Sequence, residues 1–170
     1  RSKTEILGLE KGHYSQPIFS PDGKSIVYLK QGGGWLRSPL WSNDQGVYQY
    51  LIRDKESHLL TDRGSNPHFT ENENFLYLNQ WREGHLTLQE FDVTSRQFRQ
   101  IAKTEKGIEL KVSPDGDYLV YKEDHNVYVM RNPQTGKTIS TGTKSLPAGR
   151  LSSYTGRDVE VVGSAVYWTG

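Results

Sequence analysis

The chain has 170 residues, of which 34% are hydrophobic, and its 21 basic and 20 acidic residues leave a net charge of +1. This length is enough to bury one sizeable core, so we expect one domain. The charges are spread evenly, which gives no electrostatic reason to expect nucleic acid or an anionic membrane surface as a partner. The sequence has no cysteine, which excludes disulfides and thiolate metal sites, and no apolar run long enough for a membrane span.

Both ends of the sequence interrupt a pattern. "RSKTEILGLE" lacks the apolar centre of a signal peptide and starts without methionine, and "AVYWTG" stops just after a strand-like run. We therefore expect a fragment of a longer protein. Residues 1–10 are predicted to form the outer strand of a preceding repeat, or to complete the last one.

A repeated pattern organises the chain. "FSPDGKSIVYLK" begins at Phe19, and "VSPDGDYLVYKE" begins 93 residues later at Val112. Between them, "PHFTENENFLYL" keeps the apolar run and replaces the turn letters with other turn-forming residues. Aligned on the tyrosine that ends each run, the copies lie 49, 44 and about 46 residues apart, and the fourth copy is weaker. The anchors are Tyr28, Tyr77 and Tyr121, and in the fourth copy Tyr167 or Trp168.

Each repeat contains short β-type runs separated by Gly, Asp, Asn and Pro, and no convincing helical period is present. Four antiparallel strands in 40–50 residues are typical of a propeller blade. We predict an all-β fold, a partial β-propeller of about three and a half four-stranded antiparallel blades in a single segment, 1–170. The predicted blades are 11–61, 62–104, 105–145 and a partial one at 146–170. The predicted strands are 16–20, 24–30, 46–52 and 57–61, then 66–70, 74–80, 85–92 and 97–102, then 109–113, 117–122, 126–131 and 137–141.

The Ser-Pro-Asp-Gly turns have a structural explanation. Pro21 presets φ for the first corner, Asp22 can accept a hydrogen bond from the backbone two residues on, and Gly23 accepts a positive φ. We interpret both copies as hairpin turns. The acidic pairs in "DGD" and "ENE" could donate oxygens to calcium, but solvated turns account for them better.

These repeats resemble those of TolB-type β-propellers, which occur in the periplasmic TolB protein and in the propeller domains of several hydrolases. A narrower resemblance covers nearly the whole chain and is to the propeller region of large bacterial amidohydrolases. It is carried, in order, by "GGGWLRSPLWSNDQGVYQY", "TDRGSNPHF", "VSPDGDYLVYKEDHNVYVM" and "LPAGRLSSYTGRDVEVVGSAVYWTG". The second repeat departs from the pattern by lacking Ser-Pro-Asp-Gly, and the fourth is half present. The resemblance implies a metal-dependent amidohydrolase barrel elsewhere in the parent protein, and a periplasmic or secreted location.

The motifs that catalysis would need are absent from this sequence. The sequence has no His-x-His pair, no His-Glu-x-x-His and no Gly-x-Ser-x-Gly elbow. The glycines near Lys137 do not complete a phosphate loop. We expect no catalytic residue, no metal site and no cofactor in this segment.

The loops between second and third strands carry the candidate interaction residues. In a blade, these loops and the connections to the next blade open on the same face. The first repeat places Trp35, Arg37 and Trp41 there, and the second places Trp81 and Arg82. Trp and Arg are enriched at interface hot spots. Either this face docks a partner, or the tryptophans pack back on their own blades.

Three functions are open at this point. The leading one is a non-catalytic scaffold, interaction or substrate-access module of an amidohydrolase-related protein, whose partner is the rest of that protein. The alternatives are a TolB-type envelope propeller that binds proteins, and the gating propeller of a prolyl-oligopeptidase-type serine peptidase. Because an incomplete ring leaves open strand edges, copies of the chain could also associate through them.

Overall fold

The computed structural model describes residues 12–32, 44–104, 106–123 and 126–132, together with 4, 7, 9–10, 139–140, 146–147, 158–162 and 165–169. Within these residues every regular element is a β-strand, which confirms the all-β prediction. The described part of the chain has no helix that is long and apolar enough to cross a membrane. The chain divides into two compact units, residues 1–63 and 64–170.

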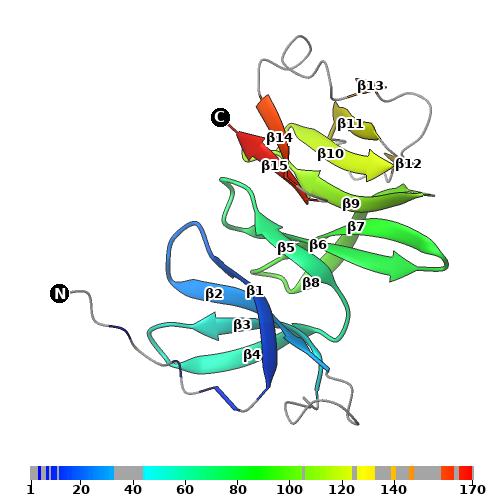
Figure 1. The fold of residues 1–170 in the computed structure, drawn as a ribbon. Coiled ribbons are helices and arrows are strands. Elements are labelled where there is room, and N and C mark those ends of the chain that lie inside the picture. The colour runs from blue at the N-terminus through cyan, green and yellow to red at the C-terminus, as the bar shows by residue number, and fades with distance from the viewer. Residues whose placement is uncertain are drawn as a thin grey trace. The chain divides into compact units, whose positions relative to one another are not determined.

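The first unit is built on one sheet of four antiparallel strands in chain order (Figure 1). Its strands are β1 (His13–Phe19), β2 (Ser25–Gln31), β3 (Gly46–Leu51) and β4 (Glu56–Thr61). Successive side chains of a strand point to opposite faces, and Val27 and Val47 are fully buried on one face of this sheet. All four predicted strands of this repeat are present, each within a few residues of its expected bounds.

The second unit contains the other two repeats. Four strands follow one another in the second sheet: β5 (Ser65–Phe69), β6 (Phe75–Arg82), β7 (His85–Asp92) and β8 (Gln97–Thr104). The third sheet contains β9 (Gly107–Val112), β10 (Tyr118–Glu123) and β11 (Asn126–Arg131). A separate hairpin, β14 (Asp158–Val162) and β15 (Ala165–Thr169), coincides with the predicted fourth copy.

The outer strand of the third repeat differs from the prediction. A strand does form within 137–141, as β12 (Ile139–Ser140), but it pairs in parallel with β8 and so extends the second sheet. The partner of β11 is instead β13 (Leu146–Pro147). Because both are only two residues long, the local pattern that predicts a strand does not determine which exposed edge it pairs with.

The pairing register also corrects the alignment of the repeats. Phe19 pairs with Ile26 and Phe69 pairs with Leu76, so the first two repeats are offset by 50 residues. The counterpart of Tyr28 is therefore Leu78, and placing Tyr77 there is wrong by one residue. Since neighbouring strand residues point to opposite faces, Tyr77 lies on the face opposite to the one its alignment with Tyr28 implies.

The first two repeats share a further backbone feature that supports this offset. Gln16 and Asn66 both have a positive φ, 51° and 52°, and each is followed by proline. Each pair lies in a bulge of the innermost strand, where the register against the next strand shifts. Pro17 and Pro67 lack an N–H group, which is tolerated on an edge strand.

The hairpin turns have the predicted chemistry. Asp22 Oδ1 accepts hydrogen bonds from Ser20 Oγ at 2.7 Å and from the backbone N of Lys24 at 3.0 Å. These bonds, of which the one from the Ser20 hydroxyl has the largest effect, lower the pKa of Asp22 to about 2. Gly23 has a φ of 69°, as its place in the motif predicts.

The other two turns repeat this arrangement. Asp115 accepts in the same way from Ser113 Oγ at 2.5 Å and from the backbone N of Asp117 at 3.2 Å. In the altered second turn, Asn72 Oδ1 accepts from the backbone N of Asn74 at 3.1 Å. The turn geometry therefore survives the loss of the Ser-Pro-Asp-Gly letters.

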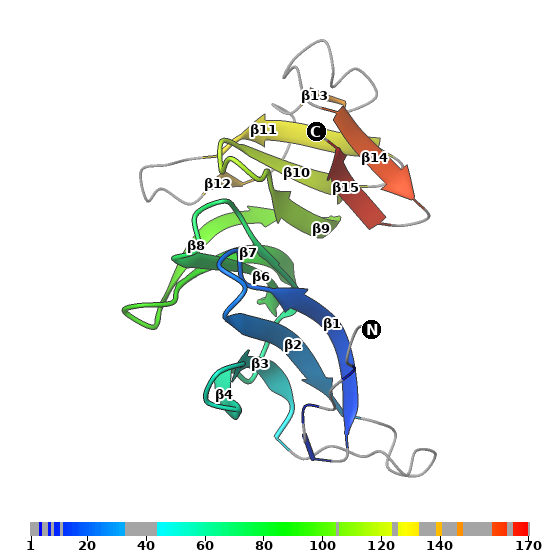
Figure 2. The ribbon, with the colours of Figure 1, turned by 90° about the vertical axis from the view of Figure 1, so that its left-hand side faces the viewer.

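The second and third sheets share one hydrophobic core. From the second sheet it contains Tyr77, Leu86, Leu88, Ile101 and Ala102, and from the third it contains Leu110, Val112, Leu119 and Tyr121. In Figures 1 and 2, β9 lies beside β6 and β7, which it contacts. Since these side chains are at most 4% exposed, the junction is as dry as a domain interior.

Side chains of the second sheet also bond the open edge of β9. Asn79 donates through Nδ2 to Leu110 O at 2.7 Å and accepts at Oδ1 from Leu110 N at 2.9 Å. Val112 N donates to His68 Nε2 at 3.0 Å, and Glu71 N donates to Pro114 O at 2.7 Å. The second sheet thus bonds the backbone of Leu110, Val112 and Pro114, every second residue along this edge, as a neighbouring strand would.

Asn79→Ala should destabilise the second unit by about 2–4 kcal/mol, because it leaves both backbone groups of Leu110 buried without partners. Chemical denaturation of the 170-residue chain measures this. Asn74→Ala, at an exposed turn position, is the matched control and should change stability by less than about 0.5 kcal/mol. Equal effects of the two substitutions would contradict the role of Asn79.

Candidate functional site

Two of the five predicted interaction residues lie in the described part of the chain. Trp81 and Arg82 end β6, and a two-residue turn, Glu83 and Gly84, leads into β7. Both turn residues have positive φ, 50° and 79°, as a tight hairpin requires. Trp35, Arg37 and Trp41 lie outside the described residues, so their part of the prediction stays untested.

Trp81 does not pack back on its own sheet. Its side chain is 62% exposed, and among the large hydrophobic side chains of the described residues only Phe19, at 65%, is more exposed. Arg82 is also exposed and donates from Nε to Gln80 Oε1 at 3.2 Å. The hairpin therefore exposes an aromatic ring on one face of β6 and a guanidinium on the other, on backbone held by the β6–β7 ladder.

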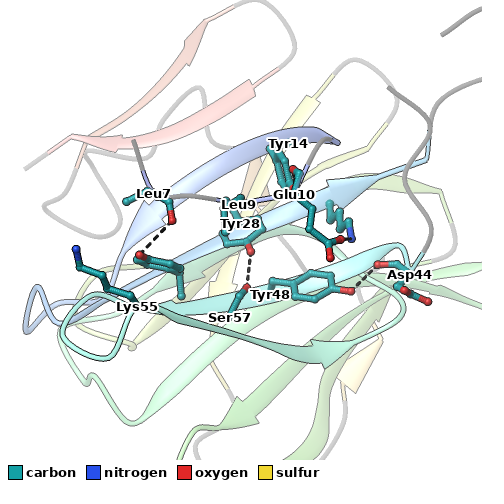
Figure 3. Close-up of a pocket in the computed structure, with 11 residues that line it drawn as sticks. Leu7, Leu9, Glu10, Tyr14, Tyr28, Asp44, Tyr48, Lys55 and Ser57 are labelled. Atoms are coloured by element: carbon teal, nitrogen blue, oxygen red, sulfur yellow. Dashed lines mark hydrogen bonds and ion pairs between the residues drawn. The ribbon is translucent and has the colours of Figure 1, made fainter. Parts of the chain in front are cut away.

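A pocket of about 340 Å³ lies on the first unit and was not predicted (Figure 3). Tyrosines from three strands form its wall: Tyr14 from β1, Tyr28 from β2, and Tyr48 and Tyr50 from β3. The remaining lining residues are Leu7, Leu9, Glu10, Lys30, Asp44, Lys55 and Ser57.

Ring contacts order this tyrosine pocket. Tyr28 and Tyr48, directly paired across β2 and β3, stack with centroids 5.8 Å apart and planes 10° apart. Tyr14 meets Tyr28 edge to face at 5.5 Å. Lys30 Nζ lies 5.7 Å from the centroid of Tyr48 and 3.6 Å from a carboxylate oxygen of Glu10. Such ring contacts fix the side chains in one arrangement.

The phenol hydroxyl groups bind backbone and side-chain oxygens around the rim. Tyr14 donates to Glu10 O at 2.6 Å, Tyr48 to Asp44 O at 2.5 Å and Tyr50 to Leu7 O at 3.3 Å. Tyr28 shares a 2.5 Å hydrogen bond with Ser57, toward which it points in Figure 3. The pocket thus ties the N-terminal residues Leu7 and Glu10 to the sheet.

Burial keeps the tyrosines of the pocket protonated. Burial raises the pKa of Tyr14, Tyr28 and Tyr48 above the ordinary value. These hydroxyls are therefore protonated at neutral pH and act as hydrogen-bond donors, not as bases. The arrangement is suited to packing and polar contact with another surface.

A second shallow pocket lies on the second sheet, lined by residues that include Phe75, Glu90, Asp92 and Arg99. Glu90 accepts hydrogen bonds from Tyr77 Oη at 2.9 Å and from Arg99 Nη2 at 2.6 Å. Burial, with the Glu90 carboxylate, raises the pKa of Tyr77. Each carboxylate oxygen of Glu90 thus has a donor, and the group is structural.

The described residues contain no group of three or more His, Asp and Glu side chains that could hold a metal ion. His68 is instead part of the sheet junction. Its Nδ1 lies 2.9 Å from Asn66 O and its Nε2 accepts from Val112 N, so the neutral imidazole with its proton on Nδ1 fits both contacts. Burial, assisted by the nearby Lys111, lowers the pKa of His68 to about 4.

The low pKa of His68 makes the junction sensitive to acid. Because the pKa is lower in the folded than in the unfolded chain, where it is about 6.5, protonation favours unfolding. The contribution of the neutral His68 to the free energy of unfolding is complete above pH 6.5 and is lost as the pH falls toward 4. The loss is no more than about 1.4 kcal/mol per pH unit. Urea denaturation between pH 4 and 7 should show this decline, and His68→Gln should flatten it. His58→Gln, near an exposed carboxylate, is the control and should keep the wild-type slope. If stability declines with falling pH as steeply in His68→Gln as in the wild type, His68 is not the cause of the decline.

The sheets define the class of fold. Successive antiparallel sheets built on four strands in chain order, with the second and third sheets packed on one shared core, are typical of the blades of a β-propeller. The chain has the fold of a partial β-propeller. No family model matches the sequence, and no curated protein is significantly similar to it.

Solved structures with the same fold include three distinct proteins. TolB from Acinetobacter baumannii is 17% identical, with a TM-score of 0.57 over 77% of this chain and 32% of its own length. An oligogalacturonate lyase from Vibrio parahaemolyticus is 10% identical, with a TM-score of 0.62 over 85% of this chain and 39% of its own. The propeller domain of the trilobed protease from Pyrococcus furiosus is 8% identical, with a TM-score of 0.55 over 81% of this chain and 43% of its own. The chain therefore spans about a third to two-fifths of these proteins, and the likeness establishes the fold.

Proposed function

We propose that this chain is a non-catalytic propeller module of a larger protein, and that it docks on a catalytic domain through the loop face that carries Trp81. The observation that carries the proposal is the exposed Trp81, held next to a tight hairpin turn. An exposed tryptophan on rigid backbone loses little entropy on binding and can supply a large contact area. Its exposure favours docking over the alternative that it packs back on its own blade.

The catalytic domain that we favour is a metal-dependent amidohydrolase barrel. Support comes from the ordered motifs of the sequence, "RSPLWS" and the closing segment "LPAGRLSSYTGRDVEVVGSAVYWTG" among them. The trilobed protease, in which the propeller is one domain of an enzyme, is a precedent for the arrangement. The second candidate is a protein-binding propeller of the TolB type, favoured by the fold likeness to TolB.

The parent gene beyond Gly170 separates these candidates at once. A barrel with a His-x-His pair on an early strand supports the first function. A chain that ends within the propeller supports the second, and an α/β-hydrolase with a Gly-x-Ser-x-Gly elbow points to a peptidase. Either of the last two outcomes overturns the amidohydrolase assignment.

Trp81→Ala should leave the stability of the module within about 0.5 kcal/mol, since the side chain is mostly exposed. In the parent protein it should weaken the association of the propeller with its partner domain by about tenfold or more, the effect of losing a hot-spot residue. Titration of the separately expressed domains by calorimetry measures the affinity, and kcat/KM of the intact protein gives a second readout.

Ile52→Ala is the matched control, because Ile52 is an apolar side chain, 37% exposed, in the β3–β4 turn. It should change neither affinity nor activity. If Trp81→Ala and Ile52→Ala behave alike in the parent protein, the loop face is not the docking surface. If Trp81→Ala unfolds the module, the packing explanation of this tryptophan is the correct one.

A further inference from the structure

The junction between the second and third blades shows how one blade covers the next. The third blade turns one face toward the second, and Leu110, Val112, Leu119 and Tyr121 on this face are between 0% and 3% exposed. Side chains from β7 and from the end of β8 complete the core. The face of a blade that carries these positions is therefore the face that its preceding blade covers.

The pairing register identifies the same face on the first blade. Phe19 pairs with Ile26 as Val112 pairs with Leu119, with turns of equal length between them. The stack of Tyr28 on Tyr48 has its counterpart in Tyr121 on Tyr128, which stack at 5.2 Å and 17°. We call the surface formed by Phe19, Ile26, Tyr28 and Tyr48 the Phe19 face.

The hairpin end of the Phe19 face is uncovered where its counterpart is buried, whereas Tyr28 is 5% exposed and so nearly as buried as Tyr121. Phe19 is 65% exposed in the 170-residue chain, whereas Val112, in the equivalent position, is 3% exposed. Ile26 is half-buried, whereas its counterpart Leu119 is fully buried. Phe19 is the last residue of β1, and its exposed ring adjoins the half-buried Ile26 across the strand pair, so that together they leave an apolar surface open to a partner.

The N-terminal residues supply a second, independent observation. "LEKG" at 9–12 corresponds to "TEKG" at 104–107, which joins the end of β8 to β9. Leu7 and Leu9 thus hold the positions of Ala102 and Thr104 in the outermost strand. Leu7, Leu9 and Glu10 lie against the tyrosine pocket, as the end of β8 lies against the third blade, but belong to no strand.

We propose that the Phe19 face is the docking surface for one further blade, and that residues 4–10 form the fourth strand of that blade. Its other three strands immediately precede this chain in the parent polypeptide, in the order that β5, β6 and β7 precede β8. The incoming blade places small and branched apolar side chains of its third strand on Phe19 and Ile26, as β7 places Leu86 and Leu88 in the core with Val112 and Leu119.

This surface differs from the Trp81 face, so the proposal does not depend on the proposed function. The test compares the 170-residue chain with the parent polypeptide extended upstream by about 40 residues, the length of one blade. Hydrogen exchange followed by mass spectrometry reports on the amides of residues 4–10. We expect exchange about tenfold slower or more in the longer polypeptide, because these amides become partners in a ladder.

Phe19→Ser gives the matching thermodynamic readout. In the 170-residue chain its melting temperature should stay near that of the wild type, because the ring is already exposed. In the longer polypeptide it should fall by roughly 5 °C, because the ring is then buried. Ile52→Ser is the control and should have no effect in either form.

Equal exchange of residues 4–10 in the two polypeptides, or equal effects of Phe19→Ser in both, would overturn the proposal. An upstream sequence without three strand-like segments overturns it as well. Dimerisation of the 170-residue chain that Phe19→Ser abolishes, with no added protection in the longer polypeptide, assigns the face to a second copy instead. None of these outcomes bears on the affinity that Trp81 controls, so the two proposals fail separately.

Discussion

The open inner edge of each sheet is the constraint on which this fold depends. Blades pack face to face, so the innermost strand has no strand partner on one side, and its N–H and C=O groups still need hydrogen bonds. At the junction between the second and third blades, Asn79 and His68 meet this need with side chains. Asn79 bonds Leu110 and His68 bonds Val112, so the two contacts together fix how β9 is aligned against the second blade.

The same edge explains where polar residues are tolerated in the core. Asn79 is 2% exposed among leucines, and an amide buried there without partners would cost more than the packing returns. Because Asn79 bonds both the N–H and the C=O of Leu110, it is satisfied and specifies one register. The first two blades reduce the demand differently, since Pro17 and Pro67 remove an N–H from the innermost strand.

Local signals in the sequence were enough for the strands and turns, because alternation and turn residues act over a few positions. The turns at Asp22 and Asp115 bond as their letters predict, and even the altered turn at Asn72 keeps the contact. Alignment on the tyrosine shifts the second repeat by one residue, because Tyr77 is not equivalent to Tyr28. The match of "SQPIF" with "SNPHF" gives the correct offset of 50, and was available in the sequence. The tyrosine pocket could not be predicted in this way, since Tyr14, Tyr28 and Tyr48 meet only after three strands pair. Only the alternating tyrosines of "VYQYL" hint at it.

The two comparable faces differ in chemistry in a way that follows from what covers them. The face of the third blade is covered within the chain and combines its stacked tyrosines with leucine and valine, which gain stability from complete removal of water. The Phe19 face combines Phe19 with tyrosines whose hydroxyls bond the carbonyls of Leu7, Glu10 and Asp44. A phenol ring offers apolar area to a neighbour while its hydroxyl satisfies a backbone carbonyl at the rim. These tyrosines hold the N-terminal residues against the sheet without ladder partners, so the outermost strand position is occupied before a neighbouring sheet pairs with it.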